Sequence, residues 1–191
     1  MSEQGASRYP RTFHGLIVSM VVLVIAVVGF WAVNSGFHQS PDARPTAVDY
    51  RKTVHEVQEA GAPLHVIYPS SLPKGWTVTS ADYTPPNGLG TEPAWSLGAV
   101  TDHDTFVGLR LEAAPLSSLI ATYVDQDAEQ GRPSTIPTRF GDTWDTFTDS
   151  GGDTGLGITV GKTELLVYGS ADKADMVTFM DALTDAELPR S

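Results

Sequence analysis

Cysteine is absent from the sequence, and basic residues are scarce. The lack of cysteine excludes disulfide bonds, a lipid-modified cysteine anchor, thiol catalysis and thiolate metal sites. The chain has 12 Lys and Arg residues against 23 Asp and Glu residues, so its formal net charge is −11. An acidic chain repels a phosphate backbone, and we therefore expect no nucleic-acid partner.

Common catalytic and cofactor motifs are missing as well. The sequence has no G-x-S-x-G serine elbow, no H-E-x-x-H zinc motif, no P-loop and no G-x-G-x-x-G phosphate cradle. We therefore predict no catalytic residue, no cofactor and no metal site, and we expect that the protein is not an enzyme.

One long apolar run contrasts with the polar remainder. It begins at Leu16 and ends at Val33, and it contains no charged residue. At ~1.5 Å of rise per residue, this segment spans ~27 Å, close to the thickness of the hydrocarbon core of a bilayer. The alternative is a cleavable signal peptide, but its apolar region runs ~7–15 residues, and Val33-x-Ser35 is a poor cleavage site. The run therefore predicts a transmembrane helix that anchors the chain in the lipid bilayer.

The basic residues near this segment predict its orientation. Arg8 and Arg11 precede it, whereas the first cation after it is Arg44. By the positive-inside rule, residues 1–15 form a cytoplasmic tail and the rest of the chain lies outside the cell membrane. The polar stretch 34–45 contains two prolines and is typical of a linker, so we expect an extracytoplasmic domain at 46–188.

Hydrophobic periodicity predicts the fold of this domain. Helical spacing of apolar residues occurs after Thr46, the expected N-cap, then from Leu116, and again from Lys173. Alternating or β-branched stretches predict strands at 65–68, 76–84, around Trp95 and Val107, from Ser134, and at 143–149, 156–160 and 163–169. The order predicts an α+β domain with a mainly antiparallel sheet of six to seven strands and three helices. Each half is a run of strands followed by a helix, which is compatible with an internal duplication.

Three acidic stretches could in principle bind a cation. They are Asp102-His103-Asp104, Asp125-x-Asp127-x-Glu129, and Asp142, Asp145, Asp149 and Asp153 around a Gly pair. The first is typical of a solvated hairpin turn. The second lacks the Gly and the final Glu of a calcium loop and is expected to form the polar end of the preceding helix. The third is typical of a loop between strands.

The aromatic and imidazole side chains leave two functional alternatives open. Trp76, Trp95 and Trp144 are either core residues or, on an exposed sheet face, a surface for sugar rings or a partner. His55, His65 and His103 lie in the folded part, and an unrecognised envelope hydrolase or transferase would require one of them to meet a carboxylate and a serine.

Several phrases resemble those of one protein family. They are Pro45-Thr46-Ala47 with Asp49-Tyr50, Tyr68-Pro69-x-x-Leu72-Pro73-x-Gly75-Trp76, Thr79-Ser80-Ala81-x-Tyr83, Trp95, and Gly169-Ser170-Ala171. Together with the anchor, they resemble the actinobacterial membrane-anchored family known as domain of unknown function 4245. The resemblance implies an exported, membrane-tethered α+β domain, and it transfers no catalytic residue.

The sequence thus predicts a single-pass membrane protein whose outer domain binds an envelope protein or a cell-wall component without catalysis. An envelope enzyme with an unrecognised site and an extracytoplasmic sensory domain are the alternatives.

Overall fold

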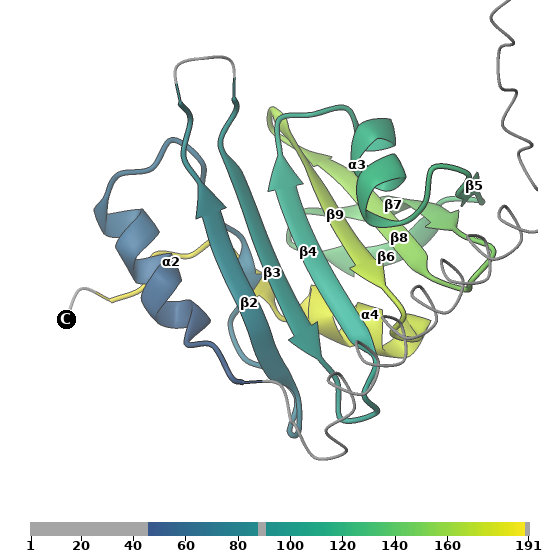
Figure 1. The fold of residues 1–191 in the computed structure, drawn as a ribbon, viewed down its shortest axis with the longest axis horizontal. Helices are drawn as coiled ribbons and strands as arrows, with labels where there is room; N and C mark the ends of the chain where they lie inside the picture. The colour runs from purple at the N-terminus through teal and green to yellow at the C-terminus, as the bar shows by residue number, and fades with distance from the viewer. Residues whose placement is uncertain (1–45, 88–90, 190–191) are drawn as a thin grey trace, which may run out of the picture. The chain divides into compact units, whose positions relative to one another are not determined.

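Three helices and ten strands follow one another along residues 46–87 and 91–189, the part of the chain that the computed structural model describes (Figure 1). The helices are α2 (Tyr50–Glu59), α3 (Leu116–Tyr123) and α4 (Lys173–Asp181). The longer strands are β2 (Thr77–Thr84), β3 (Ala94–Val100), β4 (Phe106–Glu112), β6 (Ser134–Thr138), β7 (Gly141–Thr148), β8 (Thr154–Val160) and β9 (Thr163–Gly169). The two-residue strands are β1 (Tyr68–Pro69), β5 (Glu129–Gln130) and β10 (Leu183–Thr184).

The predicted antiparallel sheet is confirmed. Its order is β2-β3-β4-β9-β8-β7-β5, and β6 pairs with β7, so that it has eight strands where the sequence predicted six to seven. Every pairing is antiparallel. A second, two-stranded sheet joins β1 to β10, and it pairs Tyr68 with Thr184. The strand predicted at 65–68 overlaps β1 only at Tyr68, and residues 65–67 are not in a strand. Its partner β10 has no signal in the hydrophobic pattern, because two residues are too few to show a period.

Successive residues of β9 show that the two faces of the sheet are covered by different helices. Leu165 and Val167 belong to the main core, which also contains apolar residues of α2 and α4. Leu166 points the opposite way and packs with Leu119 and Ile120 of α3. An internal duplication would relate the two halves of the sheet by a twofold axis that passes between the antiparallel strands β4 and β9, perpendicular to the sheet. Such an axis would place α3 and α4 on the same face, whereas they cover opposite faces. The structure therefore does not support an internal duplication.

Two glycines on β8 leave the space that α3 occupies. A Cβ atom on Gly157 would lie 2.5 Å from Cδ1 of Leu116, and one on Gly155 would lie 2.8 Å from Cγ2 of Val124. Real Cβ contacts are longer than this, so a side chain at either position would displace the side chain of Leu116 or Val124. The absence of side chains here lets α3 pack directly on the strand.

The element ends correct two details of the prediction. Asp49, and not Thr46, is the N-cap of α2, because its carboxylate accepts a hydrogen bond from the Lys52 amide at 3.3 Å. The acidic stretch that begins at Asp125 does not extend α3, which ends at Tyr123. Instead, the Asp125 side chain accepts from the backbone amide of Asp127 at 2.7 Å and forms a local turn.

The predicted membrane segment lies outside the described residues, as do the tail at 1–15 and the linker at 34–45. Within the described residues, no helix is both long and apolar enough to cross a bilayer. These residues form one compact unit.

Candidate functional site

The three tryptophans of the possible stacking surface lie in the core. Trp95 and Trp144 have no exposed surface, and Trp76 is buried against Phe179 with ring centroids 6.5 Å apart. The Trp95 indole donates to the backbone carbonyl of Ile67 at 2.7 Å. This burial corrects the surface alternative, because no indole face remains for a sugar ring or a partner. The physical reason is the alternation of side chains along β3 and β7, which directs Trp95 and Trp144 into the core that α2 and α4 share, whereas Trp76 precedes β2 and packs on Phe179 of α4.

The three histidines lie on separate elements. His55 is on α2, His65 is exposed before β1, and His103 is in the turn between β3 and β4. The His103 imidazole lies 3.3 Å from an Asp102 oxygen and 3.7 Å from an Asp175 oxygen, and 72% of its side chain is exposed. The structure therefore brings no two of these histidines into one site.

The acidic stretches do not assemble a metal site among the described residues. No group of three His, Asp or Glu side chains in this part of the chain is placed to hold an ion. Asp149 instead accepts from the Asp153 amide at 2.7 Å, which closes the turn between β7 and β8. Asp142 and Asp145 lie on β7 itself.

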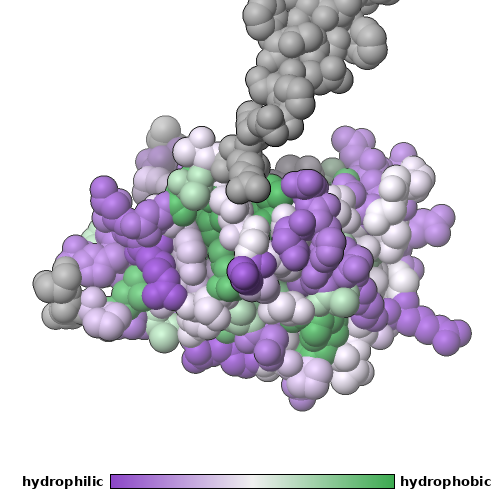
Figure 2. Space-filling view, turned by 90° about the horizontal axis from the view of Figure 1, so that it is seen from below, coloured by the Kyte–Doolittle hydropathy of each residue, from purple (hydrophilic) through white to green (hydrophobic). Residues whose placement is uncertain are grey.

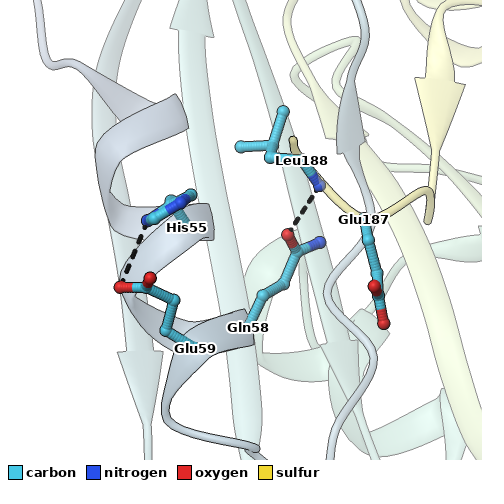
Figure 3. Close-up of a pocket in the computed structure, with 5 residues that line it drawn as sticks. All are labelled: His55, Gln58, Glu59, Glu187 and Leu188. Atoms are coloured by element: carbon cyan, nitrogen blue, oxygen red, sulfur yellow. Dashed lines mark hydrogen bonds and ion pairs between the residues drawn. The ribbon is translucent and has the colours of Figure 1, made fainter. Parts of the chain in front are cut away.

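A pocket of about 310 Å³ lies between α2 and the C-terminal segment (residues 183–188), and we call it the α2 pocket (Figure 3). It is lined by His55, Gln58 and Glu59 of α2 and by Glu187 and Leu188 of the C-terminal segment. The first three are spaced at i, i+3 and i+4, which places them on one side of the helix. Val54 and Val57 anchor the other side in the core.

Gln58 fixes the wall that the C-terminal segment contributes. Its side-chain amide donates to the Ala186 carbonyl at 3.1 Å. It also accepts from the Leu188 amide at 2.9 Å, the bond that Figure 3 marks. Tyr68 also donates to the Ala186 carbonyl, at 2.9 Å. Burial raises the pKa of the Tyr68 phenol, so it remains a neutral donor at physiological pH.

Arg139 holds the same segment from its other side. Its guanidinium donates to the Thr184 hydroxyl at 2.6 Å and lies 2.8 Å from an Asp185 oxygen. Together with the β1–β10 pair, these bonds hold residues 183–185 of the C-terminal segment, and Gln58 holds Ala186 and Leu188. The wall of the α2 pocket is therefore positioned partly by contacts that lie outside the pocket.

The His55 imidazole has one paired edge and one unpaired edge. Its Nδ1 atom lies 3.4 Å from Oε2 of Glu59, whereas its Nε2 atom is buried and has no hydrogen-bond partner within the described part of the chain. Figure 3 shows Nδ1 facing Glu59 and the opposite edge turned toward the segment that carries Leu188. The side chain is 24% exposed, so the ring is mostly enclosed.

The residues that line the α2 pocket give it a negative potential. Glu59 and Glu187 contribute carboxylates, and none of the described residues that line it is a Lys or Arg. None of them carries a hydroxyl either, so His55 meets a carboxylate there but no serine. The geometry offers hydrogen-bond acceptors to a ligand and lacks the nucleophile of a triad.

A second depression, of about 410 Å³, is more open. It is lined by Ser70, Ser71, Leu72, Pro73, Thr178, Asp181 and Ala182. Its first four residues belong to the phrase between Tyr68 and Trp76 noted in the sequence. These residues connect β1 to the turn before β2, so the local fold accounts for part of this sequence motif.

Sequence reasoning found His55 but missed the other four residues of the α2 pocket. The i, i+3, i+4 spacing of His55, Gln58 and Glu59 was a usable signal for one wall. Nothing in the sequence indicates that Glu187 and Leu188 return to α2, because that contact spans 130 residues.

Comparison with known proteins supports the family resemblance. The family model described as Protein of unknown function (DUF4245) matches residues 8–183, nearly the whole chain. A search of curated proteins gives no match. The chain therefore belongs to the DUF4245 family of proteins of unknown function.

Proposed function

We propose that this protein is a single-pass, membrane-anchored module of the cell envelope that binds a partner outside the membrane and does not catalyse a reaction. The anchor is supported by the uncharged run from Leu16 to Val33, preceded by Arg8 and Arg11. The family match begins at residue 8, so it includes this run.

The observation that carries the binding role is the composition of the α2 pocket. It brings together acceptor groups on a fixed wall, with His55 and Glu59 on one side and Glu187 on the other. Binding requires such converging groups, whereas catalysis additionally requires a nucleophile or a positioned reacting group. Figure 2 shows hydrophilic side chains in several areas of the face seen from below, with intermediate and apolar side chains between them. This favours recognition by charge and hydrogen bonding.

The second candidate is an envelope hydrolase. It is favoured by one observation, the 3.4 Å approach of His55 to Glu59 inside a pocket. An imidazole oriented by a carboxylate is a common general base. The absence of a hydroxyl among the residues that line this pocket is the reason to place binding first.

Crosslinking in the native membrane tests the binding role. We expect a crosslinkable group introduced at Glu187 to capture an envelope component, and the same group at Ser150, in the turn after β7, to capture none. Turnover of peptidoglycan, ester or phosphate substrates by the full chain, abolished by His55→Asn, would instead establish an enzyme.

The absence of cysteine allows a direct test of the orientation. We expect Ser150→Cys to react with a membrane-impermeant maleimide in intact cells, and Ser2→Cys to react only after lysis. The opposite labelling pattern would overturn the proposed topology, and labelling of neither position before lysis would place the domain inside the cell.

A further inference from the structure

We infer that the outer edge of β2 binds a short extended segment of a partner protein, with a basic side chain opposite Asp82. Strand β2 is the last strand of the eight-stranded sheet and lies at its outer side (Figure 1). At the other end of the sheet, β5 and β6 pair with β7 and cover its outer side. No residue of β2 lines the α2 pocket, so this inference goes beyond the proposed function.

The backbone bonds at the end of β3 show which groups of β2 point away from the sheet. The Thr101 amide donates to the Thr105 carbonyl at 2.8 Å, so the backbone groups of Thr101 point toward β4. Every second residue before it on β3 has the same orientation, and these residues are Ala99, Leu97 and Trp95. Their partners on β2, whose N–H and C=O groups consequently point outward, are Val78, Ala81 and Tyr83.

The first of these three outward residues already has a partner. The Val78 carbonyl accepts from the Val48 amide at 2.8 Å, which agrees with the orientation derived from β3. The outward groups of Ala81 and Tyr83 have no backbone partner within the described part of the chain. Backbone groups without a protein partner are normally solvated, so this part of the edge is accessible. Each of the two residues offers one donor and one acceptor to a further strand.

The surroundings of the edge limit the length of its occupant. Val48 occupies the edge at Val78, and a bulge follows directly on β2. Beyond the other end of β2, Pro85 and Pro86 have no N–H group with which to continue a ladder. The free stretch is therefore 80–84, which spans about 17 Å at ~3.4 Å per residue. It accommodates a short segment and not a long strand.

Asp82 makes a second copy of this chain a poor occupant. It is exposed and is the only charged residue of β2. A twofold pairing of two β2 strands that uses all the free groups must place Ala81 of one copy opposite Tyr83 of the other. The centre of this pairing falls on Asp82, so the two carboxylates lie directly opposite each other. Like charges at opposite positions are destabilising, and the edge is therefore better suited to a different chain.

The same position defines the chemistry of that chain. In an antiparallel pair, the residue opposite Asp82 has its Cβ atom within about 5.5 Å, and a lysine or arginine there forms a cross-strand ion pair. Its two neighbours lie opposite Ala81 and Tyr83, whose side chains pack partly against the main core on the other face. Apolar side chains suit these two positions. The occupant is therefore an extended segment with the order apolar, basic, apolar.

The test uses the ¹⁵N-labelled full chain in a neutral detergent and two peptides, acetyl-TVKVT-amide and acetyl-TVEVT-amide. In the free chain, we expect the amides of Ala81 and Tyr83 to exchange with solvent faster than that of Asp82, which faces β3. The lysine peptide should slow the exchange at Ala81 and Tyr83 in a saturable manner. The glutamate peptide should bind about two- to thirty-fold more weakly, because a like-charge pair replaces an opposite-charge pair.

The chain offers a matched control for the role of charge. Asp82 and Glu92 are both exposed carboxylates, and Glu92 lies in the connection before β3, outside the edge. Asp82→Asn should abolish the preference for the lysine peptide, whereas Glu92→Gln should retain it. Ala81→Pro removes an outward N–H group and no bond to β3, so it should weaken the binding of the lysine peptide.

Three results would overturn the inference: equal exchange rates at Ala81 and Asp82 in the free chain, no saturable effect of the lysine peptide, or equal affinity for the two peptides. Protection of Ala81 and Tyr83 that rises with protein concentration alone would also overturn it, because the occupant would then be a second copy. The comparison of the two peptides needs no variant, so it remains decisive if a variant fails to fold. If crosslinking from the α2 pocket captures a partner while the lysine peptide does not bind, the proposed binding function stands and only the inference about β2 is wrong.

Discussion

Trp95 and Trp144 provide a test of how much one hydrogen bond contributes to the stability of this core. Both side chains are fully buried in the same cluster, and the change to Phe removes the same atoms from each. The difference between them is the indole N–H. That of Trp95 donates to the Ile67 carbonyl at 2.7 Å, and that of Trp144 has no hydrogen-bond partner within the described residues.

The expected difference follows from the cost of an unsatisfied buried group. Trp95→Phe deprives the Ile67 carbonyl of its donor, which costs about 1–3 kcal/mol beyond the lost packing. Trp144→Phe removes an N–H group that had no acceptor. Removing this unsatisfied group offsets about 1–3 kcal/mol of the packing energy that the variant loses. We therefore expect Trp95→Phe to lower the free energy of unfolding by about 2–6 kcal/mol more than Trp144→Phe.

Urea denaturation of the full chain, followed by far-ultraviolet circular dichroism, measures both values. Circular dichroism is preferable to fluorescence because each variant loses one of the fluorophores. Equal slopes against urea concentration would show that the variants unfold from comparable native states. If Trp144→Phe is as destabilising as Trp95→Phe, the reasoning about the hydrogen bond is refuted.

Two further predictions concern the backbone and the alkaline limit of stability. Gly169 has φ of +136°, and a Cβ atom there would lie 2.3 Å from the Phe106 carbonyl oxygen, so Gly169→Ala should cost about 2–4 kcal/mol in a thermal melt. A melting temperature within 2 °C of wild type would contradict this close approach, since ~1 kcal/mol shifts it by about 2–4 °C. Burial raises the pKa of the Tyr168 phenol, so its contribution is complete below the unfolded-state pKa of ~10 and is lost as the pH rises through the folded-state pKa. Between pH 8 and 11, the free energy of unfolding of Tyr168→Phe should therefore fall less steeply with pH than that of wild type. If urea denaturation at a series of pH values gives the same dependence on pH for both proteins, the link to Tyr168 is disproved.

The longer elements were predictable because each has its own local signal. The helical spacing that begins at Leu116 predicted α3, and the strands predicted at 156–160 and 163–169 are β8 and β9, where Val160 pairs with Thr163 across a two-residue turn. Gly161 has φ of +66°, which explains the choice of residue. Local periodicity and turn chemistry thus sufficed for most of the sheet.

Contacts between distant segments were not predictable from the same signals. The pairing of β1 with β10 rests on two residues in each strand, and a pattern of period two needs more than that to be recognised. The side of the sheet on which each helix packs could not be predicted either. It depends on whether Leu166 or its neighbours face the helix, and the sequence does not decide this because both faces of β9 are apolar.

The candidate site illustrates the same limit. His55 could be named from its residue type, and Glu59 from its spacing on the helix. Glu187 and Leu188 become part of the α2 pocket because the C-terminal segment returns to α2, where the amide of Gln58 contacts it across 130 residues. Their role follows from tertiary structure alone.

The contact between Gln58 and Leu188 also sets an order of events during synthesis. The ribosome must add 130 residues after Gln58 before its partner exists, which takes about 6–26 s at ~5–20 residues per second. Throughout this interval α2 has been made, but the segment that completes the α2 pocket has not. A chain that stops before Ala186 therefore cannot form the pocket, however well its sheet has folded. Ligand binding at this position would report that translation had reached the end of the domain.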